Sequence, residues 1–199
     1  MKLPIIAYGD PVLRKQASKI ALDYPNLDIL ISNMFETMYA AAGVGLAAPQ
    51  IGLSIRLFIL DAKPFAKEHK ELATFKKVFI NPQILEETGD EWLFNEGCLS
   101  IPDIREDISR KKALRIAYLD EKGQAHEETY DGMAARIIQH EYDHLEGKLF
   151  IDKLSHLRKA MLQNKLNSIA KGFVKENYKM KFYVPKTNTP VSTKKKKKR

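Results

Sequence analysis

The chain has 199 residues, of which 44% are hydrophobic and 9% aromatic, and its formal net charge is +8. This composition suits one globular domain and excludes a disordered chain; the single cysteine excludes an internal disulfide, and no apolar run reaches the roughly 18 residues of a membrane span. Six of the positive charges lie in residues 194–199, so the rest of the chain carries a net charge of only +2. The positive net charge of the whole chain is therefore weak evidence for a nucleic-acid-binding fold.

The N-terminal part of the chain predicts a helix followed by a strand. A short helical turn is expected at Asp10-Pro11, with the aspartate as its cap and the proline in the first helical position. Residues 27–42 repeat apolar side chains at helical spacing and are followed by glycine, which predicts a long amphipathic helix. Small residues crowd positions 43–52, where a plain connector and a close approach of the backbone to a ligand are both open interpretations. Residues 55–60 predict a buried strand.

The middle of the chain predicts short strands separated by polar segments. Residues 62–77 are charged and predict a surface excursion. A strand over 78–80 is expected to end at Asn81-Pro82, with 84–87 as a candidate continuation. Residues 95–102 predict a turn-forming loop around the only cysteine.

The C-terminal half predicts a hairpin and two helices. Residues 114–119 and 125–130 flank a four-residue connection, as expected for a β-hairpin. A helix is expected over 131–147, with an aspartate as its N-cap and a glycine at its end. A second helix is expected over 155–174. Its predicted apolar stripe consists of Leu157, Met161, Leu162, Ile169 and Phe173.

The order helix, strands, hairpin, helix, helix predicts a single-domain α+β fold. Antiparallel or mixed strands would surround a central helix, with an N-terminal amphipathic helix and a C-terminal helix beside them. The domain is expected to cover residues 1–182, and residues 183–199 to form a basic, disordered tail. The first residues lack an apolar stretch of signal-peptide length, which predicts a cytoplasmic protein.

The central helix carries a motif that points to metal chemistry. His140 and His144 stand at i and i+4, so both imidazoles leave one helix face one turn apart and can bind the same ion. Glu141 stands beside the first histidine as a potential base for a metal-activated water. The alternative is a pair of ordinary histidines on an amphipathic helix.

A catalytic site of this kind needs a third protein ligand. The candidates are a downstream Glu or His, such as His156, and the upstream Cys98; His69 and His126 stand in charged, surface-like segments. Cys98 is preferred because a glycine and a proline shape an exposed loop around it. Its soft thiolate would suit Fe(II), Co(II), Ni(II) or Zn(II).

Three stretches in this order resemble the signature of bacterial peptide deformylases. They are Gly43-Val44-Gly45-Leu46-Ala47-Ala48-Pro49-Gln50, Glu96-Gly97-Cys98-Leu99-Ser100 and Gln139-His140-Glu141-Tyr142-Asp143-His144. The resemblance extends from Asp10 to about residue 170, and three motifs in order are far more specific than one.

The resemblance implies a metallo-amidohydrolase that removes the N-terminal formyl group from formyl-methionine of nascent polypeptides and releases formate. Cys98, His140 and His144 match the family's metal ligands, and the metal implied is one Fe(II) per chain, which Zn, Ni or Co can replace. Glu141 would accept a proton from the metal-activated water. The Gln50 side chain and the Leu99 backbone N–H match the groups that hold the oxyanion.

The resemblance also implies where the substrate lies. Backbone around Gly45 would pair with the extended peptide by strand addition. Val44, Met133 and Ile137 are the candidates for the methionine pocket, and Arg105 is a candidate contact to the substrate backbone.

Several charged residues lie near these motifs. Glu96 and Arg110 match an ion pair that would orient the cysteine loop. The sequence does not decide whether the Arg136 side chain faces the substrate region or solvent. Asp143 is interpreted either as a residue of the helix surface or as a neighbour of the metal ligands.

Two rival functions stay open. A metallopeptidase with the same histidine pair would take its third ligand downstream and give Cys98 no role. A ribosome- or RNA-binding protein would act through the basic C-terminal helix and tail, since residues 148–181 also carry more basic than acidic side chains. No aromatic residues interleave with the terminal lysines, so no specific DNA or RNA readout is expected. No membrane partner is expected either, because no apolar run is long enough to span a membrane. Docking to the ribosome would serve an enzyme of nascent chains.

Overall fold

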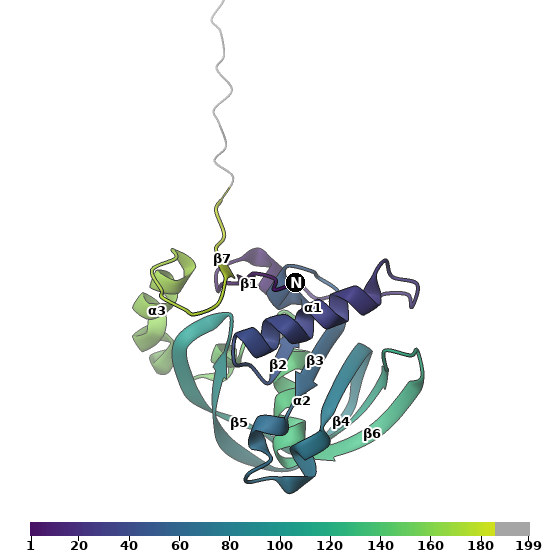
Figure 1. Cartoon of the computed structure of the whole chain (residues 1–199). Coiled ribbons are helices and arrows are strands. Elements are labelled where there is room, and N and C mark those ends of the chain that lie inside the picture. Colours follow the sequence, from purple (N-terminus) through teal and green to yellow (C-terminus); the bar gives the residue numbers. More distant parts are fainter. Residues whose placement is uncertain (186–199) are drawn as a thin grey trace, which may run out of the picture.

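The computed structural model describes residues 1–185 and has the predicted α+β architecture (Figure 1). Its three α-helices in this range are α1 (Leu27–Ala40), α2 (Gly132–Leu145) and α3 (His156–Ala170). A five-stranded antiparallel sheet has the order β2 (Gly45–Ala47), β3 (Leu57–Asp61), β4 (Lys76–Cys98), β5 (Ile101–Leu119) and β6 (Ala125–Asp131). A separate parallel pair is formed by β1 (Ile5–Ile6) and β7 (Met180–Lys181). No helix in the described range is long and apolar enough to cross a membrane.

Strand β3 is buried on both faces and separates two parts of the core. Leu57 and Ile59 pack in the cluster that covers α1, whereas Phe58 and Leu60 pack in the cluster that covers α2. This follows from the strand period of two, which sends successive side chains to opposite faces. The residues of β3 are continuously apolar because a helix packs on each face of the strand.

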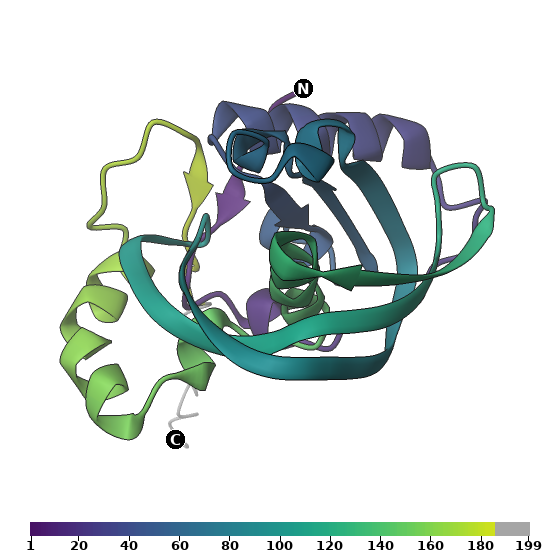
Figure 2. The same ribbon diagram turned by 90° about the horizontal axis from the view of Figure 1, so that it is seen from below.

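The long hairpin of β4 and β5 curves around α2, as Figure 2 shows from below. Four register shifts interrupt the pairing of these two strands. Such bulges bend a strand and increase its twist. One shift lies between Gly97 and Cys98, where β4 ends, and on the partner strand Asp103 has a positive φ of 60°. The end of β4 thus lies beside the C-terminal part of α2, where Cys98 Sγ is 3.4 Å from His144 Nε2.

Two strand boundaries were predicted wrongly. Asn81-Pro82 does not end a strand, because a register shift accommodates the proline, which has no N–H for the ladder. Asn81 instead takes a left-handed conformation and hydrogen-bonds to the backbone of Ile20 through its side chain. The predicted loop over 95–102 also belongs mostly to β4 and β5, with only residues 99–100 between them.

Helix α3 packs against β5 through Leu162, Leu166 and Ile169, which lie with Ile104 and Ile108 in a third apolar cluster. The prediction that Leu157, Met161 and Phe173 share this buried stripe is wrong, since their exposed fractions are 75%, 65% and 75%. Helix α3 contacts the sheet through one narrow face. Residues at positions i, i+4 and i+7, counted from residue 162, occupy that face. Leu157 and Met161 lie on another face of α3, and Phe173 follows its end.

The division into a domain over 1–182 and a tail over 183–199 stays a prediction, because only three residues of that tail lie in the described range. Residues 183–185 have no regular secondary structure, and residues 186–199 lie outside the described part of the chain.

Candidate active site

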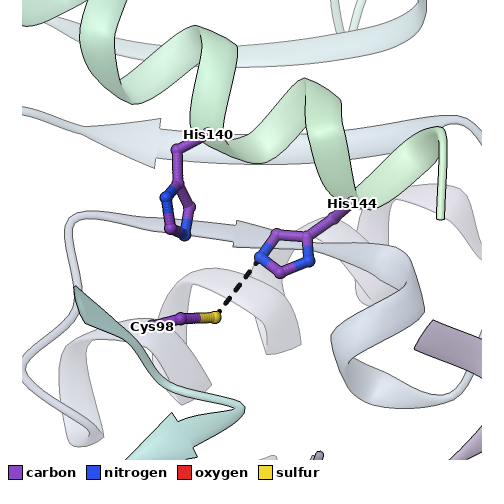
Figure 3. Close-up of side chains that lie close together, drawn as sticks. All are labelled: Cys98, His140 and His144. Carbon is purple, nitrogen blue, oxygen red and sulfur yellow. Dashed lines mark hydrogen bonds between the residues drawn. The ribbon is translucent and has the colours of Figure 1, made fainter. Parts of the chain in front are cut away.

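Helix α2 presents His140 and His144 toward the end of β4, where Cys98 stands (Figure 3). One ligand atom from each of these three residues lies within 4.8 Å of the other two. The Sγ atom of Cys98 is 3.4 Å from Nε2 of His144. The structure therefore brings together the helical pair and the distant cysteine that the sequence predicted as ligands. In residues 1–185 no other group of this kind is present, and His69, His126 and His156 lie elsewhere.

The carboxylate of Glu96 is the centre of a buried hydrogen-bond network. It accepts from Arg110 Nε at 2.7 Å and Arg110 Nη2 at 3.0 Å, and from Arg136 Nη1 at 2.9 Å. It also lies 2.9 Å from Nδ1 of His140, which leaves the Nε2 atom of that ring for a metal. Burial alone would raise the pKa of Glu96, but the hydrogen bonds with His140 and Arg110 outweigh it and hold the pKa well below its usual range.

Arg136, whose direction the sequence left open, is buried rather than exposed, with 2% of its surface accessible. It donates to the carbonyl oxygens of Trp92 at 2.6 Å and Ile108 at 2.8 Å, in addition to Glu96. Asp143 accepts from Arg110 Nη1 at 2.7 Å. These bonds join α2 to both strands of the long hairpin, which is how the histidines and the cysteine loop are held at a constant separation.

Glu141 is buried beside the histidines, with 4% of its surface exposed. Burial raises the pKa of Glu141 to about 7, despite the opposing charges of His140 and Arg110. A group with this pKa can both accept and return a proton near neutral pH. A Cβ atom at Gly45 would come within 2.4 Å of Glu141 Oε1, so only glycine fits this close approach of β2 to α2.

The side chain of Gln50 has a defined orientation. Its Oε1 accepts the N–H of Ala47 at 2.8 Å, so its amide nitrogen must point the other way. There Nε2 lies 3.4 Å from Cys98 Sγ and 3.3 Å from Ser100 Oγ. The amide N–H₂ is thus aimed at the centre of the site, where it can donate a hydrogen bond to a substrate oxygen.

A cleft of about 500 Å³ opens beside these residues. The four residues predicted to receive the peptide and its side chain, Val44, Gly45, Met133 and Ile137, all line it, and so does Arg105. Two Arg105 nitrogens are already bonded to Asn95, at 3.0 Å and 2.6 Å. Sequence reasoning did not find several further lining residues, among them Phe65, Phe94, Glu176 and Tyr178.

The donor set fits a metal ion. Burial and the neighbouring positive charges of His140 and Arg110 hold the pKa of His144 well below its usual range, so this ring is neutral, as a ligand must be. Burial would also lower the pKa of His140, but Cys98 and Glu96 outweigh it and raise that pKa to about 10. A metal ion would have to displace this proton, and the same two groups that favour the proton would favour the positive charge of the ion. Within the described residues, the buried Nδ1 of His144 and Oε2 of Glu141 have no hydrogen-bond partner. One sulfur and two nitrogens match Zn(II), Fe(II), Co(II) or Ni(II) better than the oxygen-seeking Mg²⁺ or Ca²⁺.

Comparisons with known proteins point to one family. Residues 2–160 match the family model described as polypeptide deformylase. The peptide deformylase of Christiangramia forsetii is 58% identical over 189 residues, which cover 92% of this chain and 96% of that protein. The peptide deformylase of Flavobacterium johnsoniae is 54% identical over 193 residues, covering 94% of this chain and 98% of that protein.

Solved structures share the fold. The crystal structure of a peptide deformylase from Legionella pneumophila has a TM-score of 0.75 and 39% identity, covering 87% of this chain and 98% of that one. The peptide deformylase from Thermotoga maritima has a TM-score of 0.70 and 42% identity, covering 78% and 99%.

Proposed function

Because this chain belongs to the polypeptide deformylase family, we propose that Cys98, His140 and His144 hold one Fe(II) ion per chain and that Glu141 is its acid–base residue. The chain is a hydrolase that removes the formyl group from the N-terminus of nascent polypeptides. The observation that supports the proposed site most directly is the meeting of Cys98 with the two histidines of α2, within 4.8 Å.

The proposed roles follow from position. When bound, the metal supplies Lewis acidity, which polarises the formyl oxygen and makes water easier to deprotonate. Glu141 takes a proton from the attacking water and gives it to the departing amine, so formamide and water become formate and a free N-terminus. The N–H₂ of Gln50 and the backbone N–H of Leu99 donate to the oxygen on which negative charge develops.

The cleft suggests how the substrate is held. We propose that the extended peptide pairs with the backbone around Gly45 at the edge strand β2. The methionine side chain would enter the apolar part of the cleft between Val44, Met133 and Ile137, with Arg105 at the substrate backbone. Phe94 also lines the cleft and adds apolar surface for a thioether.

The metal assignment is tested by the variant Cys98→Ala. Loss of the thiolate should lower the iron retained after anaerobic dialysis to well below one per chain, because two histidines alone bind weakly. The measurement is metal content by atomic absorption. His126→Ala is the control, because His126 pairs with Asp120 and is not among the three clustered residues. Full retention of iron by Cys98→Ala would favour the metallopeptidase alternative, and higher affinity and activity with Zn(II) than with Fe(II) would overturn the choice of iron.

We further propose that the protein works in the cytoplasm and docks on ribosomes through α3 and the basic tail. Helix α3 carries three basic and no acidic residues. Docking through phosphate contacts would weaken as salt rises. Co-sedimentation with ribosomes at low and high salt should therefore show salt-sensitive binding that weakens when residues 186–199 are deleted. Turnover of a small peptide should stay unchanged in that deletion; no co-sedimentation at low salt would refute the docking proposal.

A further inference from the structure

The segment that follows α3 returns to the active site. It leads to β7, which runs parallel to β1, so the two ends of the described chain lie side by side (Figures 1 and 2). The pairing is secured by backbone bonds from Ile5 N–H to Lys179 O at 2.8 Å and from Ala7 N–H to Lys181 O at 2.9 Å. This segment lies beyond residue 160, where the match to the family model ends.

Residues near the two chain ends donate hydrogen bonds to the carbonyl groups of the two residues that follow Cys98, the proposed metal ligand. The hydroxyl of Tyr178, just before β7, donates to the carbonyl oxygen of Leu99 at 2.9 Å. The N–H of Tyr8, just after β1, donates to the carbonyl oxygen of Ser100 at 2.8 Å. Leu99 and Ser100 form the turn between β4 and β5, outside both strands.

This turn carries the backbone N–H that, in the proposed function, donates to the oxyanion. A preorganised donor stabilises a transition state only when its peptide group is held in place before the reaction, because reorientation would cost free energy at that moment. The strand pair Cys98 and Ile101 closes the turn, but the two turn residues lie outside the strand ladder, so bonds from other elements add to its rigidity. Tyr178 supplies one of them through a side chain, and it also lines the substrate cleft.

We propose that Tyr178 is a positioning residue for deformylation. It holds the Leu99 carbonyl, which belongs to the peptide unit that follows the Leu99 N–H, and so restricts the backbone torsions of Leu99 and keeps that N–H directed at the developing oxyanion. The inference rests on the proposed oxyanion role of Leu99. It adds a residue of the C-terminal segment to catalytic groups that otherwise come from residues 45–50, the long hairpin and α2.

The variant Tyr178→Phe tests this, because it removes one hydroxyl and keeps the ring that lines the cleft. Deleting an oxyanion donor outright costs about 10²–10³-fold in kcat, so a donor that is only loosened should cost less, on the order of tenfold. KM for formyl-Met-Ala-Ser and the affinity for the product Met-Ala-Ser should stay within about twofold, since neither depends on the oxyanion. Tyr183→Phe is the matched control, from the same segment with an exposed side chain, and should behave as wild type.

The kinetic constants, iron content and Tm of Tyr178→Phe together test the positioning role. A lower kcat with unchanged KM, iron content and Tm supports the positioning role. An unchanged kcat overturns it, as does a raised KM with unchanged kcat, which would make Tyr178 a substrate contact. A loss of kcat that merely follows a loss of iron or of stability also overturns it. Failure of the proposed function is seen separately, as full activity in Gln50→Ala or no activity in the wild-type enzyme.

Discussion

Glu141→Gln is expected to lower kcat for formate release from formyl-Met-Ala-Ser by about 10²–10⁴-fold, the usual contribution of a positioned acid–base group. Glutamine has nearly the same shape as glutamate, so the packing against Gly45 is kept, but an amide cannot take a proton from water and return it to an amine. Because Glu141 is not among the three clustered ligand residues, the iron content of the variant should equal that of wild type.

The measurement is formate release under anaerobic conditions, with metal content determined on the same samples. Glu127→Gln is a suitable control, because its side chain lies on β6 with 56% of its surface exposed and should leave the rate unchanged. A rate for Glu141→Gln within tenfold of wild type would show that another group moves the proton. A large loss of iron would instead assign Glu141 a role in holding the metal.

Glu96→Gln is expected to have the largest effect on stability, lowering the free energy of unfolding by about 3–5 kcal/mol, as is typical when one partner of a buried ion pair is removed. The side chains of Arg110 and Arg136 are only 1% and 2% exposed. Without the Glu96 carboxylate, Arg136 loses its ion-pair partner and Arg110 keeps only Asp143. Water cannot compensate for the lost charge at such depth.

The same change should weaken metal binding by about 10–100-fold, since the carboxylate that orients the His140 ring is replaced by a neutral amide. Urea denaturation and competition with a chelator would measure the two effects. Glu91→Gln supplies the control, because its pair with Lys111 is exposed and wide, at 4.0 Å, and such pairs contribute at most about 1 kcal/mol. A stability loss no larger than that of this control would show that Glu96 does not stabilise the fold.

The wrongly predicted boundaries of β4 and β5 show where local patterns lose information. Residues 88–91 of β4, beyond the predicted continuation over 84–87, are exposed, so no alternation of apolar and polar side chains marks them as a strand. Their extended conformation depends on pairing with β5, which no local signal encodes. Asn81-Pro82 predicted an end to the strand, but a register shift allows β4 to continue past the proline.

The sequence by itself determined the fold class, the family and the three residues that meet at the site. Two histidines four residues apart lie on the same face whenever the segment is helical. Because a helix forms through local contacts, the sequence alone could predict that these two side chains are neighbours. Cys98 and Gln50 were assigned to the site because the three motifs occur in the family's order. Their distance from α2 could not be derived from their positions in the sequence.

Only the tertiary structure decided how those residues are held. Glu96 joins His140, Arg110 and Arg136 across separations of 14 to 44 residues in the chain, and Tyr178 reaches Leu99 across 79. These contacts depend on the register of the long hairpin and on the pairing of the chain ends. Register is set by strands distant in sequence and by bulges whose positions local propensity does not predict. The motifs therefore predicted the three clustered residues and the Glu96–Arg110 pair, whereas the contacts of Arg136 and Tyr178 could not be predicted.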